Sequence, residues 1–242
     1  MRAATALLLA ALTLVMLAAC GKEGEPSAPP TPTAASDFLT DDDRVIYSET
    51  IELGNTSLFA MASVPRTGVA AIDDFYLSRL EDFVSDAAEV AEGLREPEPP
   101  SHTTLEYSAN FEIVRDDGEV LSVRREIYSY FGGAHDNSDT LCDNFSLPDG
   151  NILELDDFFT VPQSEYLPRL TGLIADAIAA DPDPGRFYSD AADIIAEQFP
   201  FGRFCAAEDG LVFYFPPYEI GPYAAGTIEI AVLWSELSDI TA

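Results

Sequence analysis

The sequence places one histidine where its side chain could bind a ligand or transfer a proton. His135 lies in Gly132-Gly133-Ala134-His135-Asp136-Asn137, and glycine permits the left-handed backbone that lets a loop approach a ligand closely. An imidazole there could ligate a metal or act as a general base. However, one histidine cannot complete a histidine-rich zinc set, and the sequence has no Gly-x-Ser-x-Gly motif or phosphate-binding loop. We therefore favour a structural loop histidine and expect no catalytic residue, metal or cofactor.

The other histidine and the paired carboxylates carry less information. His102 follows Pro99-Pro100-Ser101, and we expect this linker residue to be solvated. Asp156-Asp157 could act as an acid and a base in glycoside hydrolysis, but a chain with 43 acidic residues contains such pairs by chance. Because two aromatic residues follow, the pair is more typical of a cap and turn after a strand.

A tyrosine-rich segment offers a second place for ligand binding. Between Gly210 and Gly226, prolines and glycines restrict the loop that carries Tyr218 and Tyr223. Tyrosine loses little conformational entropy when it is immobilised, so these side chains could form a rigid amphipathic surface. Alternatively, their rings could complete the core and leave only the hydroxyls in water, and both interpretations stay open. We expect Phe213 and Phe215 in the core. The candidate ligand-binding residues are Gly132, Gly133, His135, Asp136, Asn137, Tyr218 and Tyr223.

The N-terminus has the parts of a bacterial lipoprotein signal. Arg2 precedes a short apolar run, and Leu17-Ala18-Ala19-Cys20 resembles a lipobox. The run is too short to span a bilayer, which needs roughly 20 apolar residues. We expect lipid on Cys20 to anchor the mature chain to a membrane; the alternative is an ordinary secretory signal that ends near a cysteine. Because Gly21 is not aspartate, the anchor would be in the outer membrane, facing the periplasm, if the organism has two membranes.

The remaining cysteines, Cys142 and Cys205, would then reside outside the cytoplasm. Disulfides persist in such compartments, so we expect the two residues to pair. Two free buried thiols are the alternative, because the sequence does not show whether the geometry permits a bridge.

The composition is strongly acidic. The whole chain has a formal net charge of −31, and loss of Arg2 with the signal would leave 11 basic and 43 acidic residues, a charge of −32. Such a surface repels nucleic acid and attracts cationic partners, so we expect no nucleic-acid binding. A generally acid-rich proteome would explain the charge equally, since Lys22 is the only lysine.

Hydrophobic alternation and helical periodicity predict an α+β fold, a mainly antiparallel sheet with amphipathic helices packed on it. One helix is expected at 72–91, a second with Ser164 as its N-cap and Pro168 in its first turn, and a third at 190–199. The expected strands span residues 44–53, 58–64, 105–113, 121–127, 140–147, 151–155, 203–207, 211–215 and 227–234, the last of which would close the sheet.

Four segments together resemble a known family, the RsiV-type extracellular domain of anti-sigma factors. They are Tyr130–Asn137, Asn144–Gly150, Leu153–Phe159 and Gly210–Gly226. The likeness covers about residues 43–238, and its upstream half is similar to the accessory domain of the peptidoglycan deacetylase PdaC. In that family the outer domain of one member binds lysozyme. This chain shows neither the sigma-binding segment and membrane helix of the anti-sigma factors nor the deacetylase catalytic domain, so the resemblance implies the ectodomain fold and ligand binding only.

These observations divide the chain into four segments. We expect a signal peptide at 1–19, a lipidated cysteine and flexible tether at 20–42, a deacetylase-accessory-like half at 43–130 and an RsiV-like half at 131–242. The function we favour is a non-catalytic cell-envelope lipoprotein that binds a cationic protein such as lysozyme, or another cell-wall component. The alternatives are an envelope hydrolase that uses His135 with a carboxylate, and a structural or assembly lipoprotein.

Overall fold

The computed structural model describes residues 38–95, 104–147 and 149–241. The expected signal peptide, the lipid site at Cys20 and His102 lie outside these residues. The strands are β1 (Leu39–Thr40), β2 (Arg44–Glu52), β3 (Ser57–Pro65), β4 (Leu105–Asp116), β5 (Val120–Tyr130), β6 (Asn137–Ser146), β7 (Phe204–Ala206), β8 (Gly210–Phe215) and β9 (Ile228–Leu233). The helices are α1 (Ala70–Gly93), α2 (Gln163–Ala180), α3 (Ala191–Glu197) and α4 (Trp234–Leu237), with short 3₁₀ turns at Leu155–Phe158, Pro184–Arg186 and Tyr223–Ala225.

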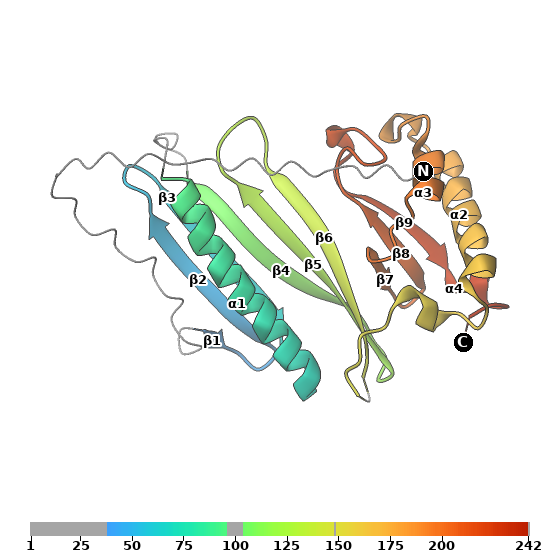
Figure 1. The fold of residues 1–242 in the computed structure, drawn as a ribbon, viewed down its shortest axis with the longest axis horizontal. Coiled ribbons are helices and arrows are strands. Elements are labelled where there is room, and N and C mark those ends of the chain that lie inside the picture. The colour runs from blue at the N-terminus through green and yellow to red at the C-terminus, as the bar shows by residue number, and fades with distance from the viewer. Residues whose placement is uncertain (1–37, 96–103, 148, 242) are drawn as a thin grey trace, which may run out of the picture. The chain divides into compact units, whose positions relative to one another are not determined.

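The first sheet has six strands in the order β1-β2-β3-β4-β5-β6. All neighbours are antiparallel except β3 and β4, which run parallel. Parallel neighbours need a crossover connection, and α1 supplies it while covering one face of the sheet (Figure 1). β1 lies at the end of the segment expected to be a tether and pairs with β2.

The periodicity of the sequence explains how α1 attaches to this sheet. Its buried residues recur at intervals of three or four, which places them on one face of the helix: Ile72, Tyr76, Leu80, Phe83, Ala87 and Ala91. They pack against alternate residues of the strands, among them Ala60 and Ala62 of β3 and Leu121 and Val123 of β5.

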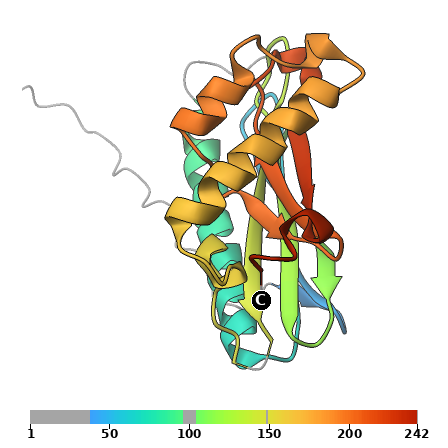
Figure 2. The same ribbon diagram turned by 90° about the vertical axis from the view of Figure 1, so that its right-hand side faces the viewer.

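The second sheet contains β7, β8 and β9 in that order and is antiparallel throughout. In β9, buried Ile228, Ile230 and Val232 alternate with more exposed residues, and together with Leu170 and Ile174 of α2 they belong to one core. Figure 2 shows α2 passing across this part of the protein with α3 beside it. Phe213 and Phe215 are completely buried in the same core, as the sequence predicted.

The α+β class is confirmed, but three expectations about its elements were wrong. The strands form two sheets rather than one, and β9 closes the second. Residues 151–155 are not a strand: only Ile152 forms a bridge, to Phe145, before the chain enters the 3₁₀ turn at Leu155–Phe158. Glu154 then caps the 3₁₀ turn in a capping box with Asp157, so one residue of the acidic pair takes part in the expected cap, while the Asp156 carboxylate accepts from the Tyr166 hydroxyl.

The start of α2 also differs from the prediction. The Pro162 carbonyl already accepts hydrogen bonds from the backbone of Glu165 and Tyr166, at 2.8 and 3.2 Å, so the helix begins at Gln163 and Ser164 is not its N-cap. Pro168 is consequently the sixth helical residue, in the second turn, where proline removes a backbone donor from the helix.

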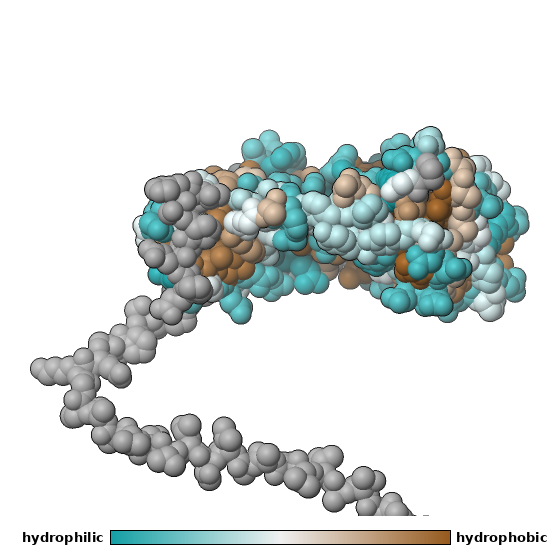
Figure 3. All heavy atoms as spheres, turned by 90° about the horizontal axis from the view of Figure 1, so that it is seen from above, coloured by the Kyte–Doolittle hydropathy of each residue, from teal (hydrophilic) through white to brown (hydrophobic). Residues whose placement is uncertain are grey.

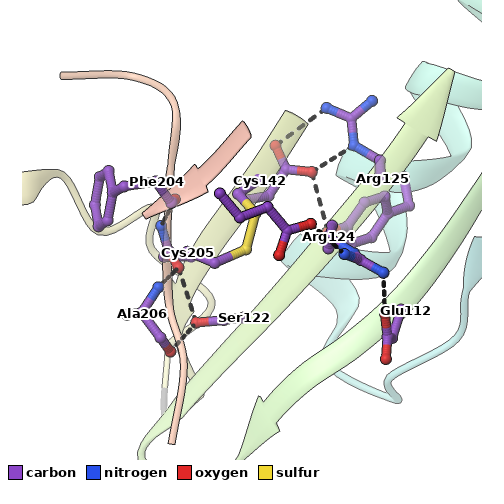
Figure 4. The surroundings of a disulfide bond; sticks show 12 residues. Glu112, Ser122, Arg124, Arg125, Cys142, Phe204, Cys205 and Ala206 are labelled. Atoms are coloured by element: carbon purple, nitrogen blue, oxygen red, sulfur yellow. Dashed lines mark hydrogen bonds and ion pairs between the residues drawn. A yellow bond between two sulfur atoms is a disulfide. The ribbon is translucent and has the colours of Figure 1, made fainter. Parts of the chain in front are cut away.

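β7 packs against the first sheet through a disulfide and a buried polar network (Figure 4). Cys142 of β6 is bonded to Cys205 of β7, with their Cα atoms 5.4 Å apart, which is the pairing expected from the sequence. Beside it, the Asn144 side chain accepts from the Ala206 amide at 2.9 Å and donates to the Phe204 carbonyl at 3.1 Å. Ser122 contacts both Asn144 and the Ala206 carbonyl at 2.8 Å. This network and the disulfide fix the second sheet on the first.

Candidate functional site

The two loops singled out in the sequence lie against each other. His135 lies between β5 and β6, and Tyr223 lies in the connection between β8 and β9. Their ring centroids are 4.3 Å apart with an interplanar angle of 35°. Both connections are at the upper end of the ribbon in Figure 1. Each sheet therefore contributes one loop to a shared site, which we call the His135–Tyr223 site.

Asp136 joins the loops by hydrogen bonds. The Tyr223 hydroxyl lies 2.7 Å from the Asp136 carboxylate and 3.0 Å from its carbonyl oxygen. Tyr128 of β5 also donates a hydrogen bond to this carboxylate. The hydrogen bond from Tyr223 is the largest cause of the lowered pKa of Asp136, and the same bond raises the pKa of Tyr223 to about 12. At neutral pH, Asp136 is thus ionised and Tyr223 keeps its proton.

The glycine pair gives the histidine loop its shape. Gly132 and Gly133 have φ angles of 87° and 114°, a region that side chains with a Cβ rarely adopt. The Tyr130 hydroxyl donates to the Gly133 carbonyl at 3.3 Å. The His135 Nδ1 atom lies 3.1 Å from the Asp136 carbonyl oxygen, and as the donor in that contact it would leave Nε2 as the acceptor of the neutral ring.

Tyr218 is the most exposed tyrosine of the site. Its exposed fraction is 60%, and among the described residues it is the only one other than glycine with a positive φ, 71°. Such backbone strain is found more often where a side chain contacts a ligand. The ring lies 5.7 Å from that of Tyr223, with an interplanar angle of 32°. His135, Tyr223 and Tyr218 therefore form a row of three aromatic rings.

Neighbouring residues hold the tyrosine loop in place. The Tyr218 amide donates to the Gly221 carbonyl at 3.0 Å, and a Cβ on Gly221 would lie only 2.3 Å from the Arg186 carbonyl oxygen. Glu219 forms a two-pronged ion pair with Arg203, at 2.5 and 2.6 Å. The loop is thus held by an internal hydrogen bond, by close packing on Arg186 and by the Arg203–Glu219 ion pair, and a partner would meet a preformed surface. Figure 3 looks onto this end of the protein, where the described surface is mostly hydrophilic or of intermediate hydropathy, with smaller hydrophobic patches between.

The structure brings together most of the candidate residues. His135, Asp136, Tyr218 and Tyr223 meet, Gly132 and Gly133 shape the loop, and Asn137 begins β6, opposite Ser129. Tyr218 faces solvent, whereas Tyr223 is half-buried with its hydroxyl bound to Asp136. The sequence analysis missed Tyr128 and Tyr130. Their i, i+2 spacing in a strand that leads into the glycine loop places them on one face, and this signal could have identified them.

The chemistry of the site suits binding. The hydroxyls of Tyr223 and Tyr128 donate hydrogen bonds to the Asp136 carboxylate. The His135 ring contacts the Asp136 backbone carbonyl rather than a carboxylate. Within residues 38–95, 104–147 and 149–241, no three histidine, cysteine or acidic side chains are arranged to hold a metal ion. Over the same residues, no helix is long and apolar enough to cross a membrane.

Part of this site lies in a segment that matches a family model. Residues 156–235 match the family model described as "Protein of unknown function (DUF3298)". The matched segment contains Tyr218 and Tyr223 and ends at Ser235, in α4. His135 and Asp136 precede it.

One curated protein and two solved structures are similar to this chain. The chain is 27% identical over 145 residues to the peptidoglycan-N-acetylmuramic acid deacetylase PdaC of Bacillus subtilis strain 168, an alignment that covers 57% of this chain but only 30% of that protein. A DUF3298 family protein from Pseudomonas aeruginosa PAO1 has a similar structure, with a TM-score of 0.59 and 17% identity over 83% of this chain and 93% of the other. A DUF3298 member from Bacteroides fragilis NCTC 9343 gives a TM-score of 0.53 and 20% identity over 83% and 92%. The similarity to PdaC noted in the sequence is confirmed, and the RsiV-type resemblance stays a prediction.

Proposed function

We propose that this protein is a lipoprotein of the cell envelope, anchored through Cys20, whose ectodomain binds a cationic protein of the cell wall, such as a lysozyme, without catalysing a reaction. The observation that carries the proposal is the exposed Tyr218 ring, held at a positive φ beside Tyr223, whose own ring packs on His135. Rigid, exposed tyrosines are frequent anchors of protein interfaces.

The charge of the protein supports a cationic partner. With 43 acidic residues against 12 basic ones, the protein attracts cations over long range, which raises association rates at low salt. The deacetylase PdaC, by its name, acts on peptidoglycan, and a role of this relative in the cell wall agrees with a partner found there.

The experiment is surface plasmon resonance of the acyl-free ectodomain against several lysozymes, with cytochrome c as an unrelated basic protein. We expect higher salt to slow association and to change dissociation little, because charge acts mainly on the encounter. Tyr218→Ala or Tyr223→Ala should weaken binding by about 1–3 kcal/mol and should do so through faster dissociation. Leu39→Ala is the matched control, since it truncates an exposed side chain on β1.

Two results would refute the proposal. Equal binding to every lysozyme and to cytochrome c would indicate a nonspecific charge effect, and no binding to any lysozyme would exclude this partner.

The hydrolase alternative is tested separately with His135→Ala: loss of turnover on cell-wall substrates by a folded variant would establish catalysis. Co-purification of another envelope protein that binds the Tyr218→Ala and Tyr223→Ala variants as tightly as the wild type would favour a structural or assembly role.

A further inference from the structure

A cavity of about 390 Å³ lies between α1 and the first sheet. This volume is in the range of small-molecule sites. Arg125 and Ile127 of β5 line it, and because side chains alternate along a strand, they lie on the opposite face of the sheet from Tyr128. The cavity is therefore separate from the His135–Tyr223 site.

Two small residues create this space. Ala62 of β3 and Ala109 of β4 are register partners beneath α1, and the pairing of the two strands ends at them. Beyond this pair the strands separate, so Ser63 and Asn110, from the other face, also reach the lining. The apolar wall is completed by Leu80 and other core residues.

Arg125 is the charged group on the sheet side. Its Nε and Nη2 atoms donate to the Asp143 carboxylate at 2.6 and 3.2 Å, and the Tyr76 hydroxyl donates to the same carboxylate at 3.2 Å. The Arg125 and Asp143 side chains are only 16% and 14% exposed. This support fixes the guanidinium, and its Nη1 atom has no hydrogen-bond partner among the described residues, which leaves it free to bind a carboxylate.

Three charged side chains of α1 line the opposite wall. Arg79 and Asp82 form a solvent-exposed ion pair at 3.3 Å, and such pairs contribute little stability, so both side chains can turn to a ligand. Asp86 lies one turn further along the helix. It is close enough to Tyr107 that its charge, after the larger effect of burial, helps to raise the pKa of that phenol.

The cavity thus has two positive and two negative side chains on its wall. A simple anion would be repelled by the acidic protein, and a simple cation would leave the Nη1 donor of Arg125 without an acceptor, whereas a molecule with both charges can bind Nη1 at one end and Asp86 at the other. Arg125 is the register partner of Phe111 in β4, and Asp86 lies near Tyr107, four residues before Phe111 on the same strand. At about 3.3 Å per residue, the Arg125 end and the Asp86 end of the cavity are therefore roughly 13 Å apart along the strand. A fully extended tripeptide spans about 10 Å, and side chains from both walls shorten the gap.

We propose that this cavity binds a short peptide with free termini. Its carboxylate contacts Arg125 and Arg79, its ammonium contacts Asp86, and its side chains lie against the apolar wall.

The test is an NMR titration of the complete secreted chain carrying Cys20→Ser. We expect tri-alanine to shift the amide signals of Leu80 and Ile127 saturably, and tri-alanine with an acetylated N-terminus and amidated C-terminus to bind about tenfold or more weakly. Arg79→Gln and Asp86→Asn, on the exposed rim, should each weaken binding by several fold. Ala109→Leu fills the cavity and should abolish binding, whereas Arg169→Gln, which breaks a surface pair with Asp239, should leave it unchanged.

The proposal is overturned if neither tri-alanine nor tri-leucine gives saturable shifts, if capped and free peptides bind equally, or if folded Ala109→Leu still binds. Folding of each variant is checked from its amide spectrum. Because no residue of the His135–Tyr223 site lines this cavity, either result leaves the proposed protein-binding function to be judged on its own data.

Discussion

Replacing Asn144 by alanine tests how the two sheets are held together. Asn144 is 3% exposed, and its removal leaves the Ala206 amide and the Phe204 carbonyl without partners. Ser122 can still donate to the Ala206 carbonyl. Each buried, unsatisfied backbone group costs about 1–3 kcal/mol, and water entering the vacated space recovers part of that cost. We therefore expect the free energy of unfolding to fall by about 2–4 kcal/mol.

Urea denaturation under non-reducing conditions, followed by circular dichroism, measures this change. Asn151→Ala is the control: its side chain is exposed and, among the described residues, bonds only to Asp149, at 2.7 Å, so the effect should stay within about 0.5 kcal/mol. Asn144→Asp gives a second check. A carboxylate can accept from Ala206 but cannot donate to Phe204, so this variant should gain stability as the pH falls and the carboxyl becomes protonated. An Asn144→Ala variant within about 1 kcal/mol of the wild type would contradict the reasoning.

Three further outcomes are expected. Reduction of the Cys142–Cys205 disulfide, or its replacement by two alanines, should lower the free energy of unfolding by about 4 kcal/mol, because the bridge closes a loop across 63 positions; equal denaturation midpoints with and without reductant would argue against this. Tyr223→Phe removes a donor from an ionised carboxylate and should raise the pKa of Asp136, measured by carboxyl ¹³C NMR; an unchanged pKa would show that the hydrogen bond is absent in solution. Labelled fatty acid should enter the wild-type chain but not Cys20→Ser, and equal labelling would exclude lipid attachment there.

Local patterns were enough to predict most elements of the fold. The alternation from Leu105 and the three- and four-residue spacing around Tyr76 correspond to β4 and α1, because burial of one face selects residues at those periods. The prediction was wrong where a nearby backbone interaction overrides the pattern. The segment at 151–155 looks like a strand, but Glu154 caps a 3₁₀ turn that begins at Leu155, which leaves only one bridge, from Ile152 to Phe145.

The site itself could be predicted only as separate parts. His135 and Tyr223 are separated by 88 positions, and their contact depends on how the two sheets are oriented. Nothing in the loop sequences indicates that the Tyr223 phenol would donate to Asp136, since that bond requires the chain to return to the same place after three strands (β6, β7 and β8) and two α-helices (α2 and α3). Glycine and aromatic composition identified both loops, whereas their junction is a property of the tertiary structure.

The orientation of the sheets also determines how well the site can bind. A partner that meets Tyr218 and Tyr223 on fixed backbone avoids the entropy cost of ordering the loops, which would otherwise reduce affinity. The bond from Tyr223 to Asp136 links loops of different sheets, and the disulfide and the Asn144 network hold β7 of one sheet against the other. A weakened network should therefore reduce binding even though Asn144 touches no partner, and the loss should exceed that of the Asn151→Ala control. If Asn144→Ala lowered stability and left binding unchanged, the loops would form the site without help from the sheets.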